Sequence, residues 1–184
     1  FVALALWLPN YYMSVYHLPI ATAGVLTTFY SLPGSVFRAL GGWLSDIFGA
    51  RTIMYWTFCV SILCLFFLSY PETTLVITGV GGVKLSFFFR VGLVPFVLLT
   101  IILGFFMSLG KAAVYKHIPV YYPNNVGSTG GIVGLIGGLG GFSLPIIFGI
   151  MNDLTKVWTS CFMLLFFIFL VSLLWMHCTI LVME

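Results

Sequence analysis

A single arginine, Arg38, is the residue whose chemical type and position most strongly suggest a function. It lies in an apolar stretch, eight positions before Asp46 in a polar turn. At 1.5 Å per residue, this spacing places it about 12 Å from a helix end, near the middle of a hydrocarbon layer roughly 30 Å thick. An arginine there costs about 2.5 to 3.5 kcal/mol, so we expect it to face the bundle interior and bind something. The alternative is a structural arginine that donates to carbonyls freed at Pro33.

A glycine-rich stretch at residues 123–153 is the second feature that could do chemistry. Its glycines recur at alternating spacings of four and three, so one face of a helix would carry only small residues. In hydrocarbon such a face lets a neighbouring backbone approach closely, as a helix-packing surface. It could equally bring bare backbone against a small ligand, because glycine has no side chain. The sequence leaves both interpretations open.

Lys111 and Ser108 share a face of another apolar stretch, with Gly104 and Tyr115 at helical spacings. Lys111 could contact a ligand, or its ammonium could extend to the membrane surface. No carboxylate is expected within a membrane span, because the acidic residues fall in expected turns or at the chain end. A cavity that holds cations and no carboxylates favours an anion as its ligand. The four acidic residues are Asp46, Glu72, Asp153 and Glu184.

No group of side chains suggests catalysis. The three histidines lack metal-ligand spacing, and no Ser/His/Asp or Cys/His arrangement is present. The four cysteines lie in apolar runs without a C-x-x-C pair, which predicts neither a disulfide nor a metal site. The glycines are not followed by the G-K-[ST] of a nucleotide-binding loop. We therefore expect no enzyme, no metal and no cofactor.

The composition is that of a membrane protein. The chain is 61% hydrophobic and 6% charged, with a mean hydropathy of +1.18, whereas soluble domains carry about 25% charged residues. The net charge of +3 is scattered, without the basic run that binds nucleic acid. The first residue is Phe1, inside an apolar run, so we expect a piece of a longer protein.

Six apolar segments predict about six crossings of the bilayer. A mixed loop at 71–94 separates the third from the fourth, and we expect it outside the membrane, with a short strand or an interfacial piece. The turns that follow the second and fourth segments begin at residues 45 and 116, and the few lysines and arginines do not settle the orientation. The segments are 1–16, 22–43, 52–70, 95–115, 123–153 and 157–182.

Two stretches resemble a known family. GGWLSDIFGAR at 41–51 is similar to the G-x-x-x-D-x-x-G-R signature of the major facilitator superfamily. Residues 110–149 look like the tenth and eleventh helices of bacterial nitrate/nitrite porters of the NarK type. The resemblance implies an all-α polytopic membrane protein, in which residues 1–184 form the carboxyl-terminal six-helix half, helices seven to twelve. It also places the ends near 51 and 116 on the cytoplasmic side.

The resemblance implies a substrate site between the two halves of the transporter, near the bilayer midplane. In the family, one arginine of the second helix and one of the eighth hold the anion, and Arg38 matches the latter. Gly131 and Gly134 match substrate-facing positions of the eleventh helix, and we include the adjoining Gly130. The second arginine would lie in the missing amino-terminal half, so this chain alone should not transport.

The resemblance also implies a gate at the turn that contains Asp46 and Arg51, where charge pairs form and break as the halves rock. The alternative for Asp46 is a solvated turn residue.

The chemistry of the anion agrees with a site at Arg38. Nitrate and nitrite are small and planar, so a planar guanidinium can meet two of their oxygens at once.

The predicted function is therefore alternating-access transport of nitrate, nitrite or both, across the bacterial inner membrane, as in nitrate assimilation. Whether the protein works as an antiporter or with protons stays open. One alternative is a major facilitator for another small organic anion or a sugar, although sugar sites favour amides and the chain has no glutamine. Another is a non-transporting membrane scaffold whose glycine helix only packs against a partner.

Overall fold

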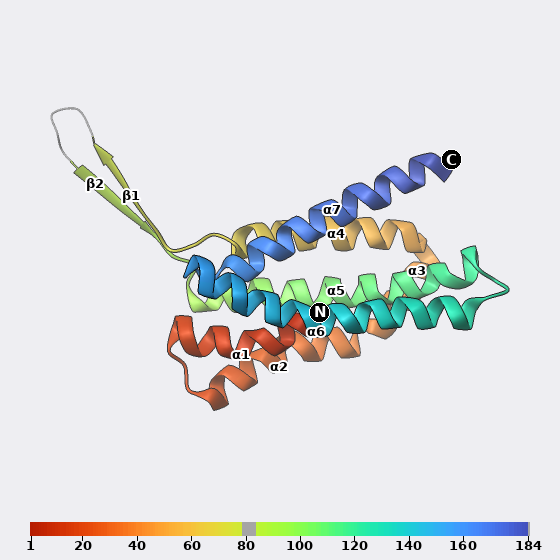
Figure 1. Ribbon diagram of the computed structural model, residues 1–184, viewed down its shortest axis with the longest axis horizontal. Helices are drawn as coiled ribbons and strands as arrows, with labels where there is room; N and C mark the ends of the chain where they lie inside the picture. The colour runs from red at the N-terminus through yellow and green to blue at the C-terminus, as the bar shows by residue number, and fades with distance from the viewer. Residues whose placement is uncertain (79–83, 184) are drawn as a thin grey trace.

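The computed structural model describes residues 1–78 and 84–183, and in these ranges the chain forms seven helices and one two-stranded sheet. The helices run side by side along the long axis of the molecule, and the sheet projects beyond one end (Figure 1). The helices are α1 (Val2–Tyr16), α2 (Ile20–Val36), α3 (Arg38–Phe48), α4 (Ala50–Leu68), α5 (Leu93–Tyr121), α6 (Val126–Thr155) and α7 (Ser160–Met183). The strands are β1 (Thr73–Thr78) and β2 (Lys84–Phe89), paired antiparallel as a hairpin.

Helix α5 is the centre of the bundle, with α2, α3 and α4 packed against it. Two of its glycines allow this packing. A Cβ placed at Gly104 would lie 2.6 Å from the backbone oxygen of Tyr30, and one at Gly110 would lie 2.6 Å from the Thr57 methyl group. Neither position has room for a side chain, so α2 and α4 can approach α5 only because these residues are glycine.

The hydrophobic core is aromatic at the end of the bundle that carries the hairpin. The Tyr11 ring of α1 stacks on Phe96 of α5 with centroids 4.8 Å apart, and Phe162 of α7 meets the Tyr11 ring edge-on at 5.3 Å. Phe96 and Phe162 are almost fully buried. Aromatic pairs of this kind add about 0.5 to 1.5 kcal/mol beyond the area they bury, so this end fixes three helices to one another.

The prediction of a polytopic helical membrane protein is confirmed, with differences in the spans. Among the described residues, α4, α5, α6 and α7 are long and apolar enough to cross a membrane. The predicted second span is broken: α2 and α3 form a bent pair with an angle of 43°, which counts as a fifth span when taken together. The predicted first span, α1, has only 15 residues.

The prediction of a turn directly after Tyr115 is wrong, because α5 continues through Pro119 to Tyr121. Pro119 removes only one intrahelical hydrogen bond, and it lies in the last turn, where the Tyr122 amide still donates to the Ile118 carbonyl at 2.8 Å. In the predicted loop at 71–94 the structure has the hairpin, and residues 79–83 lie outside the described ranges.

Candidate functional site

Arg38 is the first residue of α3, immediately after the break between α2 and α3. The break follows Pro33, whose carbonyl accepts a hydrogen bond from the Phe37 amide at 2.9 Å. The guanidinium does not cap carbonyls there. The Arg38 side chain is exposed, and its guanidinium carbon lies 5.5 Å from the centroid of the Tyr115 ring of α5. This half of the molecule therefore does not enclose Arg38, and the expectation that it faces the interior of the intact transporter stays a prediction.

Tyr115 joins the arginine to the glycine helix. Its ring lies under Arg38, and its hydroxyl is 3.5 Å from where a Cβ at Gly134 of α6 would stand. An aromatic ring under a guanidinium stabilises the cation by about 0.5 to 1 kcal/mol at an exposed position. The sequence reasoning did not include Tyr115 in the site, although its spacing of four from Lys111 on the same helix face was available as a signal.

A cavity of about 510 Å³ lies between α1, α4, α5, α6 and α7. Lys111 and Tyr115 line it from α5, and Gly134 lines it from α6. Thr57 of α4 also lines it; this side chain is only 6% exposed, and its hydroxyl has no hydrogen-bond partner in the described part of the chain. A buried hydroxyl without a partner is costly, and this one packs beside Gly110 of α5.

The predicted glycines are placed differently from one another. Gly134 lines the cavity. A Cβ at Gly130 would lie 3.8 Å from the Ile118 side chain of α5, and one at Gly131 would meet nothing within 4 Å. Further glycines of α6 line the cavity and were not predicted, because a glycine pattern alone does not tell which helix face borders a cavity. These are Gly137, Gly138, Gly140 and Gly141.

Ser108 is not among the residues that line this cavity. It is 2% exposed, and its hydroxyl donates to the Phe105 carbonyl at 2.9 Å, within α5. Such a bond satisfies a hydroxyl in an apolar surrounding without any ligand. The structure thus brings Arg38, Lys111 and Gly134 together around Tyr115 and the cavity, and it leaves Ser108 in the helix packing.

The two residues predicted to gate both connect to the end of α5. Asp46 forms an ion pair with Lys116, and Arg51 donates to the Tyr121 hydroxyl at 2.9 Å. Asp46 was expected in a turn, but it lies in the last turn of α3, where a negative charge faces the negative end of the helix dipole. Lys116 offsets this, and it can do so because α5 continues past the predicted turn.

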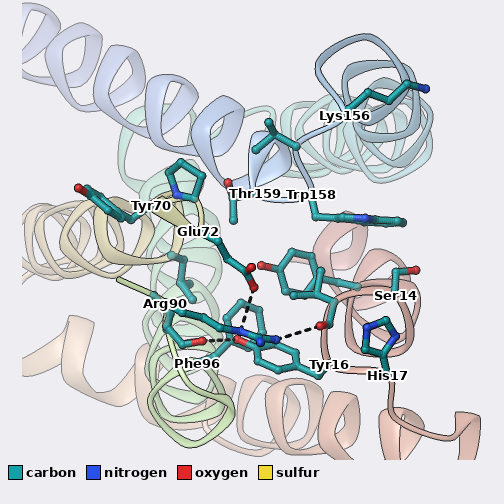
Figure 2. Close-up of a pocket in the computed structure, with 16 residues that line it drawn as sticks. Ser14, Tyr16, His17, Tyr70, Glu72, Arg90, Phe96, Lys156, Trp158 and Thr159 are labelled. Carbon is teal, nitrogen blue, oxygen red and sulfur yellow. Dashed lines mark hydrogen bonds and ion pairs between the residues drawn. The ribbon is translucent and has the colours of Figure 1, made fainter. Parts of the chain in front are cut away.

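At the opposite end of the bundle, Arg90 connects the base of the hairpin to α1 (Figure 2). Arg90 pairs with Glu72 at 2.9 Å, donates to the Val15 carbonyl at 3.2 Å and lies 5.7 Å from the Tyr16 ring centroid. These contacts border a second cavity of about 380 Å³, and Lys156 points away from it (Figure 2). Arg90 is thus committed to holding the base of the hairpin against α1.

Apolar spanning helices packed around a cavity that carries a lysine, with an arginine presented beside it, define a polytopic membrane protein with a cationic site. The family model of the Major Facilitator Superfamily matches residues 1–182. The chain therefore belongs to the Major Facilitator Superfamily, which is a transporter family and not an enzyme family.

Three curated relatives show where in the family it lies. The chain is 46% identical over 181 residues to the "Probable nitrate/nitrite antiporter NarK1" of Thermus thermophilus, covering 98% of this chain and 41% of the relative. It is 29% identical over 180 residues to the "Nitrite extrusion protein" of Bacillus subtilis (strain 168), covering 96% of this chain and 41% of the relative. It is 27% identical over 150 residues to the "Probable nitrate transporter NarT" of Staphylococcus aureus (strain N315), covering 82% of this chain and 34% of the relative.

The predicted resemblance to this group of nitrate/nitrite transporters is confirmed by these matches. The chain spans about two fifths of the length of the first two relatives. No solved structure matches it.

Proposed function

We propose that the protein to which this chain belongs carries nitrate, nitrite or both across the bacterial inner membrane by alternating access. Residues 1–184 would supply the carboxyl-terminal half, and a second half would complete the site. The names of the relatives support this substrate class. Their coverage supports a protein more than twice the length of this chain.

The observation that carries the proposal is the unpaired guanidinium of Arg38. Among residues 1–78 and 84–183, no carboxylate pairs with it, and it is exposed over Tyr115 beside the cavity. An exposed cation at membrane depth is costly unless a partner covers it. A site shared between two halves supplies that cover, and a small planar anion supplies the charge. The guanidinium fork can then donate two parallel hydrogen bonds to two oxygens of the anion.

Lys111 supplies a positive charge that lines the cavity itself, whereas Arg38 lies beside it over Tyr115. The other residues that line this cavity are mostly apolar side chains and glycines. Among them, Gly134 leaves α6 backbone in place of a side chain. We assign Lys111 to attracting the anion electrostatically and Arg38 to fixing its orientation, because an ammonium is a point charge while a guanidinium is a planar fork.

The connections of Asp46 and Arg51 to α5 suit a gate. Both are at the surface, where the side chains of Lys116 and Asp46 are 41% and 57% exposed. Exposed pairs of this kind contribute about 0 to 1 kcal/mol. A contact this weak can hold one conformation and still break during each transport cycle, which a rocking mechanism requires.

The test is counterflow in proteoliposomes that contain the intact protein. Vesicles loaded with unlabelled nitrite should accumulate external ¹⁵N-nitrate, and empty vesicles should not. An excess of lactate or glucose should leave uptake unchanged. Repeating the experiment with and without a proton gradient separates exchange from proton-coupled uptake. Nitrate uptake that lactate or glucose blocks, or no uptake of nitrate or nitrite at all, would support the alternative of another solute.

A further inference from the structure

The two-stranded hairpin has one continuous apolar face. Residues directly opposite in an antiparallel pair share a face, and every second residue of a strand returns to it. Leu75 pairs with Phe87 and Ile77 pairs with Leu85. All four side chains are about half exposed or more. The opposite face is mixed, with Thr74, Val76, Thr78, Lys84, Ser86 and Phe88.

This apolar face forms one wall of a groove of about 570 Å³. Every hairpin residue that lines the groove belongs to that face: Thr73, Leu75, Phe87 and Phe89. The opposite wall consists of the adjoining ends of α4 and α5, with Phe66, Phe67, Tyr70, Pro95 and Leu99. The groove therefore lies where the hairpin meets two candidate membrane spans.

Contacts at its base hold the hairpin in this position. Arg90, directly after β2, is bound to Glu72 and to the Val15 carbonyl. The Tyr70 ring meets Phe89 edge-on at 4.9 Å. These contacts connect both strands to the helices at the base of the groove, so they set the position of the hairpin wall relative to the helix wall.

The groove continues onto an exposed apolar surface at the end of α4. Phe66 and Phe67 are 53% and 54% exposed and lie in the last turn of α4, a helix apolar enough to span the bilayer. A large exposed apolar surface at the end of a span is favourable only against hydrocarbon. Arg90 borders the groove with its side chain 41% exposed, and a cation beside the end of a candidate span is suited to meet a lipid phosphate.

We propose that this groove binds an acyl chain of a phospholipid from the leaflet on the hairpin side, with the apolar face of the hairpin as its cover. The hairpin then lies in the interface with its mixed face toward water, as amphipathic elements do at membrane surfaces. This role is independent of which solute the protein carries, because it involves neither Arg38 nor the cavity beside it.

The test uses two neighbouring positions that differ only in the face they occupy. Leu75 and Val76 are 52% and 55% exposed and lie on opposite faces. In the intact protein, with the exposed Cys59 and Cys178 first replaced by serine, Leu75→Cys and Val76→Cys are each labelled with an environment-sensitive nitrobenzoxadiazole dye. The protein is reconstituted into phosphatidylcholine vesicles. Quenching is measured with doxyl groups on the lipid acyl chains and with iodide in the water.

The label at position 75 should be quenched several-fold more by doxyl lipid than the label at 76, and iodide should show the reverse order. Equal iodide quenching at both positions would overturn the proposal, because the hairpin would then stand free in water. A label at 75 shielded from both quenchers would also overturn it, because protein would then fill the groove. Phe87→Cys and Phe88→Cys repeat the comparison on the second strand, in case a β1 variant does not fold.

Discussion

Helices α5 and α6 are almost equal in length, with 29 and 30 residues, and both contain glycine, but they use it in opposite ways. In the most apolar part of α5, 44% of the residues are buried, whereas only 6% are buried in the most apolar part of α6. Gly104 and Gly110 of α5 sit so close to Tyr30 and Thr57 that a methyl group would collide. A Cβ at most glycines of α6 would meet nothing within 4 Å, as at Gly127, Gly131, Gly137, Gly138 and Gly140.

The difference separates two reasons for glycine in a membrane helix. In α5 the missing side chain lets neighbouring helices of the same bundle approach, which is the packing role. In α6 it leaves backbone bare toward a cavity and toward open surface. For α6 the sequence left helix packing and ligand contact open, and most of its glycines pack against nothing within the described part of this chain. We infer that the α6 glycines serve a ligand or the remainder of the protein.

The largest effect is expected where the glycines of α5 are packed. Gly104→Ala in the intact protein should destabilise it by about 1 to 3 kcal/mol, because the added methyl group forces α2 away from α5. Thermal unfolding in detergent, followed by tryptophan fluorescence, measures this loss. The matched control is Gly137→Ala, which has nothing within 4 Å of the new methyl and should unfold within a few degrees of the parent. Equal loss in both variants would remove the distinction between the helices.

A substitution in α6 should affect ligand binding more than folding. Gly134→Val fills part of the cavity beside Tyr115, and we expect nitrate affinity to fall about tenfold, or about 1.4 kcal/mol, while the unfolding temperature changes little. Nitrate titration by isothermal calorimetry measures the affinity. Gly127→Val, on the open part of the same helix, should bind nitrate as the parent does. If Gly134→Val instead unfolds like Gly104→Ala, the α6 glycines are packing residues as well.

Tyr115 sharpens the comparison, because it belongs to α5 but reaches Gly134 of α6. Tyr115→Leu removes the ring under Arg38, which is worth about 0.5 to 1 kcal/mol, so nitrate affinity should fall two- to fivefold. Tyr115→Phe keeps the ring and should retain most of the affinity. If the Phe variant loses as much as the Leu variant, the hydroxyl matters and the stacking does not.

The smallest effect concerns the ion pair that holds the end of α5 to α3. Asp46→Asn, Lys116→Gln and the double variant form a cycle whose coupling energy should be below about 1 kcal/mol, because the pair is exposed and screened by salt. Unfolding measured in low and high salt gives this energy. A coupling of several kcal/mol would contradict a contact that breaks during each cycle.

Much of the fold follows from the sequence, because hydrocarbon enforces helix wherever an apolar run is long enough. The last four spans were predicted, three of them within a few residues at both ends and α5 except for its last six residues. The break at Phe37 was not, because Pro33 is tolerated within α2 and the bend appears only at the following turn. The continuation of α5 past Tyr115 was missed for a related reason: Pro119 lies inside the helix and does not end it.

The candidate site was only partly predictable. The charge of Arg38 in an apolar run marked it at once, because such a residue is rare. The contribution of Tyr115 and Thr57 depends on which helices meet, and single-helix spacing does not contain that information. Ser108 shows the converse error, since sharing a helix face with Lys111 did not bring its hydroxyl to the cavity. The assignment of these residues to a substrate stays a prediction.

The most direct test measures nitrate affinity in the intact protein and in two single variants, each with one arginine changed to lysine. Arg38→Lys keeps the charge and loses the planar fork, so nitrate affinity should fall at least about tenfold. Arg90→Lys makes the same change at a guanidinium already bound to Glu72 and Val15, and affinity should stay within a factor of about two. Unchanged nitrate affinity in Arg38→Lys would contradict the central claim that this guanidinium holds the anion.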